Sequence, residues 1–558
     1  MVIPTAGFCS QFLQRTAALS APLRVFRTPW TRQSLHVEFP PIIPTLTTSY
    51  VHGTSSTPLL HDTVAEALQK SVERWPDREA MVFLQDGVRK TYAEFQQDVD
   101  RAAAGLLALG LRKGDRLGMW GPNTYEWILS QFATAKAGII QELFFTLKLQ
   151  TASPKVLPEL RSVILLDSRQ PGMFHFDDVM QAGDSRHVKQ LQDLQKKLSF
   201  DDPINIQFTS GTTGAPKGAT LSHHNIVNNA YFVGKRVGYT WKPHHRVCVP
   251  VPLYHCFGSV GGGIAMAVHG LSLVFPSAGY SGKANLEAMQ SERCTYVYGT
   301  PTMYIDMLNQ PDLAKYDLSS VEGGLVAGAP CPPELVKKVV LQMGIKEMTI
   351  GYGTTENSPV TFLGCPLDNM ERKSETVGYI IDHTEAKIVN PTTGQIMPLG
   401  MKGEIMVRGF CVMLEYWSEQ AKTQECITKE GWYRTGDIGS LDAYGYCKID
   451  GRIKDMLIRG GENIYPAEIE QFLHTHPKVK EAQVVGVKDP RMGEEVCACI
   501  KLVDGQECTA EEIKAYCKGQ IAHFKIPRYV LFMTSFPLTI TGKIQKQKLR
   551  EEVEKQLN

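Results

Sequence analysis

The chain has 558 residues and a mass of 62.1 kDa, enough for a large and a smaller domain, and its 43% hydrophobic and 21% charged residues exclude a largely disordered protein. Its 59 Lys and Arg balance its 58 Asp and Glu, so no basic surplus favours nucleic acid or an anionic membrane as a partner. The 13 cysteines form no C-x-x-C pair, which favours buried free thiols over a disulfide framework or a zinc site.

The first 37 residues have the composition of an amphipathic targeting segment. They contain many Ser and Thr, no acidic residue before Glu38, and four arginines: Arg15, Arg24, Arg27 and Arg32. They lack the continuous apolar core of a secretory signal. We therefore predict a mitochondrial transit peptide over residues 1–37 and a location in the mitochondrial matrix. The alternative is a disordered basic tail that has no targeting function.

From Thr63 to Ile350 the sequence alternates between helical and strand patterns. Apolar spacing predicts helices over 63–74 and 125–137. Strands are predicted at 79–84, 116–120, 163–166, 204–208, 247–251, 271–275, 296–298, 323–327 and 348–350. This alternation predicts α/β layers in which helices cover mainly parallel sheets.

The apolar stretch 257–275 resembles a membrane span in hydropathy only. Five glycines and His269 interrupt it, and Gly270 marks a stop between a helix and a strand. We predict a buried helix–strand pair and no transmembrane segment.

The pattern of predicted elements changes near residue 394. Short strands at 403–408 and 444–449, separated by Gly turns, predict a small β-rich subdomain. After Gly451 the sequence is again rich in charged residues and strongly patterned. We therefore predict a large domain over 60–450 and a C-terminal domain over 451–558.

The strongest local motif follows the strand predicted at 204–208. It is a run of small, hydroxylated and cationic residues: Thr209, Ser210, Gly211, Thr212, Thr213, Gly214, Ala215, Pro216 and Lys217. Glycines let the backbone aim N–H groups at an anion, hydroxyls add donors, and the lysine adds positive charge, which suits a polyphosphate. The motif is not a Walker A loop because Gly-Lys-Ser/Thr is missing. A generic Ser/Thr/Gly loop is the alternative.

This motif resembles the signature of the adenylate-forming superfamily, which comprises acyl-CoA synthetases, luciferases and peptide-synthetase adenylation domains. Further blocks follow in the family's order: PLYHCFG at 252–258, YGTPT at 298–302, GGLVAGAP at 323–330, YGTTE at 352–356, YRTGD at 433–437, GRIKD at 451–455, RGGENIYP at 459–466 and PLTITGK at 537–543. The resemblance extends from about Thr63 to the C-terminus. The form of the 459–466 block favours CoA over luciferin chemistry, with an ordinary hairpin as the alternative.

The resemblance implies an α/β fold with a large N-terminal domain of layered sheets, a small β-rich subdomain and a mobile α+β C-terminal domain. It also implies an ATP-dependent fatty acid–CoA ligase for medium-chain acids, with ATP and CoA as co-substrates and Mg²⁺ as cofactor. In the first step a carboxylate attacks the α-phosphate of ATP to give acyl-AMP and pyrophosphate. In the second step the CoA thiolate displaces AMP.

The same resemblance implies roles for individual residues. The loop 209–217 would hold the β- and γ-phosphates, Glu356 would bind Mg²⁺, and Thr355 would contact the α-phosphate. Adenine would lie between Tyr352 and a wall made of Gly328, Ala329 and Pro330. Asp437 would bind the ribose hydroxyls with support from Arg452, and Lys543 would contact the α-phosphate and the carboxylate. His255, Gly299 and Thr300 would line the acyl pocket. Lys454 would be the hinge, and Gly460 and Gly461 would lie beside CoA.

Each assignment has a simpler structural alternative. Tyr352 and His255 could be core residues, Asp437 a turn residue, Glu356 a helix cap, and Lys543 a solvated lysine.

The chain departs from the family pattern between residues 139 and 200. After Ala137 and Gly138 the family has Asn-Pro and a further βα unit, whereas this chain reaches the strand predicted at 163–166 without them. Loss of a strand and helix from a layered sheet would expose apolar surface and could abolish folding. Two other functions therefore stay open: an adenylating enzyme with a carrier-protein acceptor, and a catalytically impaired isoform that binds nucleotide or a partner.

Overall fold

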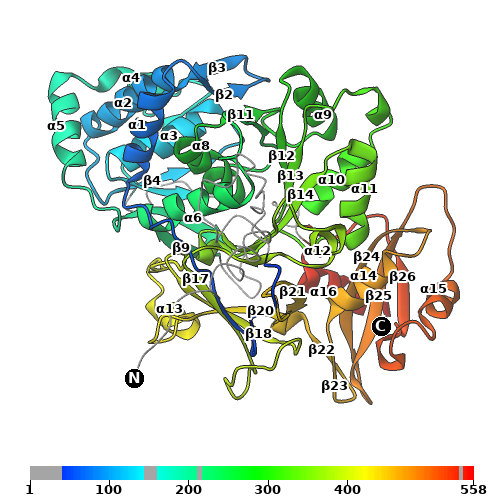
Figure 1. Ribbon diagram of the computed structural model, residues 1–558. Helices are drawn as coiled ribbons and strands as arrows, with labels where there is room; N and C mark the ends of the chain where they lie inside the picture. Colours follow the sequence, from blue (N-terminus) through cyan, green and yellow to red (C-terminus); the bar gives the residue numbers. More distant parts are fainter. Residues whose placement is uncertain (1–40, 144–159, 210–215, 539–543, 558) are drawn as a thin grey trace, which may run out of the picture.

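The computed structural model describes residues 41–143, 160–209, 216–538 and 544–557 (Figure 1). Three large sheets contain strands from residues 50–452, and a fourth sheet contains strands from residues 457–532. The predicted α/β class is confirmed. The predicted segment 1–37 lies outside the described residues.

The largest sheet has nine strands in the order β16-β15-β14-β13-β12-β10-β11-β2-β3. Their bounds are β2 (Glu79–Phe83), β3 (Val88–Thr91), β10 (Arg246–Cys248), β11 (Ser272–Phe275), β12 (Tyr296–Gly299), β13 (Gly323–Val326), β14 (Glu347–Gly353), β15 (Val360–Leu363) and β16 (Tyr379–Ile380). The pairs from β2 to β14 are parallel, and β3, β15 and β16 pair antiparallel at the two ends.

Both faces of this sheet are buried. Val247 and Val249 contribute to one hydrophobic core, whereas Cys248 between them contributes to a second core on the opposite face. The second core includes residues of α9 (Gly282–Ser291), α10 (Pro301–Leu308) and α11 (Pro333–Met343). Successive side chains of a strand point to opposite faces of the sheet, and both faces are apolar here. The sequences of these strands are therefore continuous apolar runs.

A second sheet has the order β19-β9-β8-β5-β4. Its strands are β4 (Arg116–Met119), β5 (Ile140–Leu143), β8 (Pro203–Thr209), β9 (Lys217–Ser222) and β19 (Glu415–Tyr416). The main core includes residues of its strands and of the helices α1 (Val64–Arg74), α2 (Tyr92–Ala108), α3 (Tyr125–Lys136), α6 (His223–Arg236) and α8 (Ala265–His269). Helix α1 begins with a capping box in which Thr63 and Glu66 satisfy each other's backbone N–H groups.

The strand predicted at 163–166 does not join either of these sheets, so that part of the layered prediction was wrong. It is reduced to β6 (Ile164–Leu165), which pairs only with β7 (Phe174–His175). Strand β5 already has β4 and β8 as its two neighbours, so neither of its sides is open to a further strand. The helices α4 (Phe176–Ala182) and α5 (Ser185–Gln195) follow.

The apolar stretch 257–275 forms the predicted buried helix and strand. It contains α7 (Cys256–Gly258), a π-helical segment η3 (Ser259–Ile264), α8 and β11. Gly270 ends α8 with a φ of +69°, and a Cβ there would lie 2.2 Å from the Trp75 ring. In the part of the chain that the structure describes, no helix is both long and apolar enough to cross a membrane.

The third sheet is antiparallel and corresponds to the predicted β-rich region. Its order is β1-β17-β18-β20-β21, with β1 (Tyr50–His52), β17 (Thr384–Val389), β18 (Gly403–Gly409), β20 (Tyr433–Leu441) and β21 (Cys447–Arg452). The remaining short helices of this part of the chain are η4 (Leu313–Lys315), η5 (Thr355–Asn357), α12 (Met370–Glu375) and α13 (Gln420–Cys426), of which α13 contacts β20.

The C-terminal sheet starts after η6 (Ile453–Asp455). It contains β22 (Leu457–Arg459), β23 (Glu462–Ile464), β24 (Val479–Asp489), β25 (Gly493–Leu502) and β26 (Tyr529–Phe532). Its helices are α14 (Pro466–Leu473), α15 (Ala510–Cys517), η7 (His523–Lys525) and α16 (Lys546–Leu557). The two cores of this region contain only residues from Leu457 onward.

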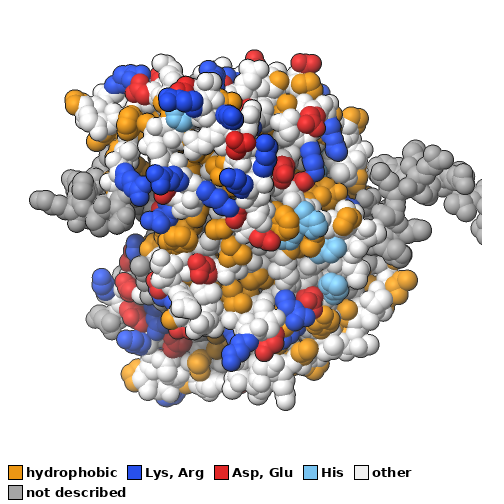
Figure 2. All heavy atoms as spheres, turned by 90° about the vertical axis from the view of Figure 1, so that its left-hand side faces the viewer, with side chains coloured by type: hydrophobic (Ala, Val, Ile, Leu, Met, Phe, Trp, Pro, Cys, Tyr) orange, Lys and Arg blue, Asp and Glu red, His pale blue; other side chains and the backbone are white. Residues whose placement is uncertain are grey.

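The surface and the thiols agree with the composition. Figure 2 shows Lys and Arg side chains interspersed with Asp and Glu side chains on one face of the molecule, as expected from a net charge of +1. Every cysteine among the described residues is a free thiol, and most are buried.

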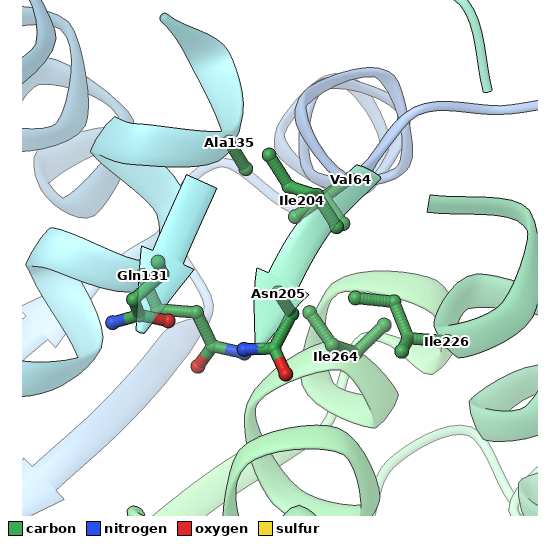
Figure 3. Close-up of a pocket in the computed structure, with 8 residues that line it drawn as sticks. Val64, Gln131, Ala135, Ile204, Asn205, Ile226 and Ile264 are labelled. Carbon is green, nitrogen blue, oxygen red and sulfur yellow. The ribbon is translucent and has the colours of Figure 1, made fainter. Parts of the chain in front are cut away.

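A small cavity of about 10 Å³ lies where β5 and β8 pair (Figure 3). Gln141 of β5 is the register partner of Asn205 of β8, and both side chains line the cavity together with Gln131 of α3. Both amide atoms of Gln141 and the amide oxygens of Asn205 and Gln131 are buried, and none of them has a hydrogen-bond partner among the described residues. A group of polar atoms in a layer of apolar side chains therefore lies at the start of the shortened 139–200 region.

Candidate nucleotide site

The two described ends of the phosphate motif lie in the antiparallel strands β8 and β9. Thr209 ends β8 and Lys217 begins β9, and the two residues are register partners. The Thr209 hydroxyl donates to the Lys217 carbonyl at 3.4 Å. Pro216 is exposed. The predicted residues Ser210, Gly211, Thr212, Thr213, Gly214 and Ala215 lie outside the described residues.

Glu356 lies in η5, which follows the carboxyl end of β14 in the nine-stranded sheet. Its side chain is buried, and the Tyr416 hydroxyl donates to Glu356 Oε1 at 2.7 Å. The Lys217 ammonium nitrogen lies 4.9 Å from the centroid of the Tyr416 ring. Tyr416 therefore joins the phosphate hairpin to the glutamate predicted to bind metal.

The residues around Glu356 fit a hard divalent cation. They offer a buried carboxylate and, next in the chain, the hydroxyl of Thr355, both oxygen donors. Mg²⁺ is commonly held by one or two carboxylates, with phosphate oxygens and waters completing its shell. The donor set is thus suited to Mg²⁺ that arrives with a nucleotide.

The buried Asp437 and the half-buried Tyr352 form a hydrogen-bonded pair. The Tyr352 hydroxyl donates to Asp437 Oδ2 at 2.7 Å, and Arg452 Nε lies 3.2 Å from Asp437 Oδ1. Asp437 lies in β20 opposite Arg452 of β21, so it is not a turn residue. Burial raises the pKa of Asp437, although the Arg452 charge and the Tyr352 hydrogen bond act in the opposite direction.

The loops after β12 and β13 lie side by side at the carboxyl ends of parallel strands. Gly328 has a φ of +90°, and a Cβ there would contact Thr300 Cγ2 at 3.8 Å. Thr300 caps α10 by accepting the Met303 N–H at 3.4 Å, and the Gly299 carbonyl accepts the Ala327 N–H at 3.3 Å. Ala329 and Pro330 continue the second loop. Crevices at such strand ends are the usual ligand sites of open α/β sheets.

His255 caps a helix in this structure. Its Nδ1 accepts the Phe257 N–H at 3.1 Å, at the start of α7. The neighbouring Cys256 thiol donates to the Thr355 hydroxyl at 3.9 Å, so this block lies beside the nucleotide residues. The role of His255 in an acyl pocket stays a prediction.

Lys454 lies in η6, close enough to Arg452, Asp437 and Lys217 for their charges to act on it. Desolvation, followed by the Arg452 charge, lowers the pKa of Lys454 to about 8. The predicted hinge lysine thus belongs electrostatically to the nucleotide site.

The proposed CoA-side glycines form the tight turn of the β22–β23 hairpin. Gly460 has a φ of +56° and Gly461 of +91°, as a two-residue hairpin turn requires. A Cβ on Gly460 would lie 2.6 Å from Met492 Cε. Among the contacts of the described residues, none joins these glycines to the nucleotide residues. Lys543 lies outside the described residues.

Sequence reasoning identified Tyr352, Glu356, Asp437, Arg452 and Lys217, which the structure brings together, but it missed Tyr416. That tyrosine occupies a two-residue strand, β19, outside every quoted block. Its only sequence signal is an aromatic residue in a short apolar run, which does not distinguish it from a core residue.

Comparisons with known proteins agree with this geometry. Residues 68–417 match the AMP-binding enzyme family, and residues 468–543 match the AMP-binding enzyme C-terminal domain. The protein named medium-chain acyl-CoA ligase ACSF2, mitochondrial, of Danio rerio is 66% identical over 600 residues, with 99% of this chain and 98% of the relative covered. The Homo sapiens protein of that name is 51% identical over 556 residues, covering 91% of this chain and 90% of the relative.

Solved structures show the same architecture. The anthranilate CoA ligase AuaEII in complex with anthranoyl-AMP superposes with a TM-score of 0.80 at 26% identity, covering 90% of this chain and 99% of that one. The alignment with the Danio rerio relative is longer than this chain, 600 against 558 residues, so that relative contains residues without a counterpart here.

Proposed function

Because the chain belongs to the AMP-binding enzyme family, we propose that it is an ATP-dependent medium-chain fatty acid–CoA ligase of the mitochondrial matrix. The observation that carries this proposal is the convergence of Asp437, Tyr352, Glu356 and Lys217 from three separate sheets on one site. The named relatives support the medium-chain acid and the compartment.

The first step activates a carboxylate that is a poor electrophile, because expulsion of oxide from it is prohibitive. A carboxylate oxygen attacks the α-phosphorus of ATP, the bond to the β-phosphate oxygen breaks, and pyrophosphate leaves. Acyl-AMP then carries a good leaving group. The chain's contribution is to hold the reactants in line and to balance charge at the phosphates.

The ribose end is held by the buried Asp437, whose two carboxylate oxygens can accept hydrogen bonds from both hydroxyls. Arg452 orients that carboxylate from the neighbouring strand. Tyr352 offers its ring to adenine, with Gly328, Ala329 and Pro330 on the other side.

The phosphate end is held by the hairpin around Lys217 and by Glu356. Mg²⁺, held by Glu356 and the phosphates, would neutralise developing charge on the polyphosphate. In this proposal Thr355 donates to the α-phosphate, and Lys543 supplies positive charge to the α-phosphate and carboxylate oxygens during adenylation.

The second step needs the C-terminal segment to move, so that Lys543 leaves and CoA enters. We place the domains at 60–450 and 451–558, with Lys454 as the hinge. After rotation the turn at Gly460 and Gly461 faces CoA. The CoA thiolate attacks the acyl carbon, and AMP leaves with the bonding electron pair.

AMP release by the purified chain tests the proposal. With octanoate and Mg·ATP we expect release that depends on CoA. Lys543→Ala should lower the rate at least about a hundredfold, because a charge that stabilises the transition state is lost. Lys548→Ala removes an exposed lysine of the same tail and should leave the rate unchanged.

The other outcomes identify the alternatives. AMP release that does not depend on CoA but needs a carrier-protein thiol would assign the acyl group to another acceptor. ATP binding without adenylate formation by folded protein would make the chain an impaired isoform, which the unpartnered amide group at Gln141 would then help to explain.

A further inference from the structure

Tyr416 contacts both charged groups of the phosphate end of the site. It is only 4% exposed. Its hydroxyl donates to Glu356 Oε1 at 2.7 Å, and the Lys217 ammonium lies over its ring at 4.9 Å from the centroid. One side chain thus binds an anion at its edge and a cation on its face, as a phenol ring permits.

The backbone of Tyr416 is fixed to the phosphate hairpin. Strand β19 pairs with β9, with Tyr416 opposite Ala219. The Trp417 N–H donates to the Gly218 carbonyl at 2.7 Å, next to Lys217. The Tyr416 N–H donates to Thr423 Oγ1 at 2.9 Å. These contacts hold the ring at the base of the hairpin, independently of Glu356.

The arrangement keeps opposite charges from pairing with each other. Within the described residues Lys217 makes its contact with the ring and Glu356 with the hydroxyl, and no direct ion pair joins the two. A direct Lys217–Glu356 pair would neutralise the lysine that a phosphate needs and the carboxylate that a metal needs. A ring between them leaves both available.

We propose that Tyr416 is a positioning residue that holds Glu356 oriented for Mg²⁺ and Lys217 oriented for the polyphosphate. The inference rests on the proposed function, since it assumes that ATP binds with a divalent cation at this site. In this proposal the Tyr416 hydroxyl orients Glu356 for the metal, and the Tyr416 ring orients Lys217 for the phosphates. Mutations that remove the hydroxyl alone or the whole ring therefore separate the two effects.

The chain contains a matched control. Tyr446 is also buried, at 3% exposure, and donates its hydroxyl to a buried carboxylate, Asp368 Oδ1, at 2.5 Å. The Arg372 guanidinium lies over its ring at 4.2 Å. This tyrosine repeats the same pair of contacts away from the nucleotide residues, so Tyr446→Phe reports the structural cost of losing such a hydroxyl.

The experiment measures ATP affinity of the full chain by calorimetry, with Mg²⁺ and with EDTA, together with the melting temperature. Tyr416→Phe should reduce the enhancement of ATP affinity by Mg²⁺ on the order of tenfold, because a hydrogen bond to a charged group is lost, and leave the affinity in EDTA unchanged. Tyr416→Leu should also weaken binding in EDTA severalfold, because the contact with Lys217 is lost. Tyr446→Phe should change only the melting temperature.

Tyr416 would have a structural role alone if Tyr416→Phe and Tyr446→Phe lowered the melting temperature alike and neither changed the Mg²⁺ dependence. That result overturns the inference and leaves the proposed function standing. A wild-type chain whose ATP binding is indifferent to Mg²⁺ would overturn both. Because Tyr416→Phe conserves the ring, it decides the matter even if Tyr416→Leu does not fold.

Discussion

Lys454 shows how a single residue at the nucleotide site can depend on pH. Its pKa of about 8 is below the ordinary lysine value of 10.5, owing to desolvation and to the Arg452 charge. The lysine is cationic below pH 8 and loses its charge as pH rises through that value. A cation beside Lys217 helps to bind phosphate, so the charge state of Lys454 should be visible in ATP affinity.

We expect the ATP affinity of the wild-type chain to fall by up to about tenfold between pH 7 and pH 9, since one pKa unit corresponds to a factor of ten. Lys454→Arg should remove most of this fall, because a guanidinium stays charged. Calorimetric titration at both pH values measures it. Equal falls in both proteins would assign the titration to another group.

The titration of Lys454 changes the free energy of unfolding in the opposite direction to the ATP affinity. Between pH 8 and 10.5 the unfolded chain binds more protons at Lys454 than the folded chain does. The contribution of Lys454 to the free energy of unfolding therefore rises with pH from about 8 to 10.5, whereas ATP affinity falls with pH around pH 8.

At the scale of elements, the pairing of β5 with β8 places the amide of Gln141 opposite Asn205, in a cavity whose other lining residues are mostly apolar. Gln141 is 1% exposed, and neither atom of its amide has a partner. By contrast, Gln207 on β8 is 2% exposed and donates to the Ser259 hydroxyl at 2.9 Å. The two residues have the same side chain in the same sheet and differ in hydrogen bonding.

Gln141→Leu should raise the free energy of unfolding by about 1–3 kcal/mol, because a buried amide without partners pays its desolvation cost uncompensated. Gln207→Leu should lower it, since the hydrogen bond that Gln207 donates to the Ser259 hydroxyl is lost. Urea unfolding of both variants compares them. Loss of stability in both would mean that Gln141 has a partner in solution, such as a water in the adjoining cavity.

At the scale of the molecule, the hydrophobic cores divide at the C-terminal segment. The described members of the cores before residue 450 and of those after residue 457 form separate clusters. The contacts across the division include polar ones, such as Lys402 Nζ to Glu468 Oε2 at 3.5 Å. Separate cores with polar contacts between them suit a segment that rotates between two reaction steps.

We expect two transitions in calorimetric unfolding of the chain. Ile500→Ala, in the C-terminal core, and Met289→Ala, in the core of the nine-stranded sheet, should each cost about 2–5 kcal/mol in their own region. Each variant should lower the temperature of one transition only. A single transition that both variants shift equally would show that the two regions unfold as one unit.

The sequence alone predicted the chemistry of the blocks and determined part of the elements. The roles predicted for the blocks at 352–356 and 433–437 depend on a few neighbouring positions, and apolar periodicity of 3.6 or 2 reports which face of an element is buried. The helices α1 and α3 and the six parallel strands of the nine-stranded sheet were predicted to within a few residues for this reason, whereas β3, β15 and β16 were not predicted. The roles of the loop 210–215 and of Lys543 stay predictions from the sequence blocks, because these residues lie outside the described residues.

Only the tertiary structure decided which distant residues meet. Tyr416 reaches Glu356 across 60 positions of the chain, and Tyr352 reaches Asp437 across 85. The strand at 163–166 left the large sheets because β5 had β4 and β8 as neighbours, and His255 became a helix cap because the chain turns at Phe257. Such contacts follow from how strands pair and how sheets pack, and local sequence patterns do not encode either pairing over such separations.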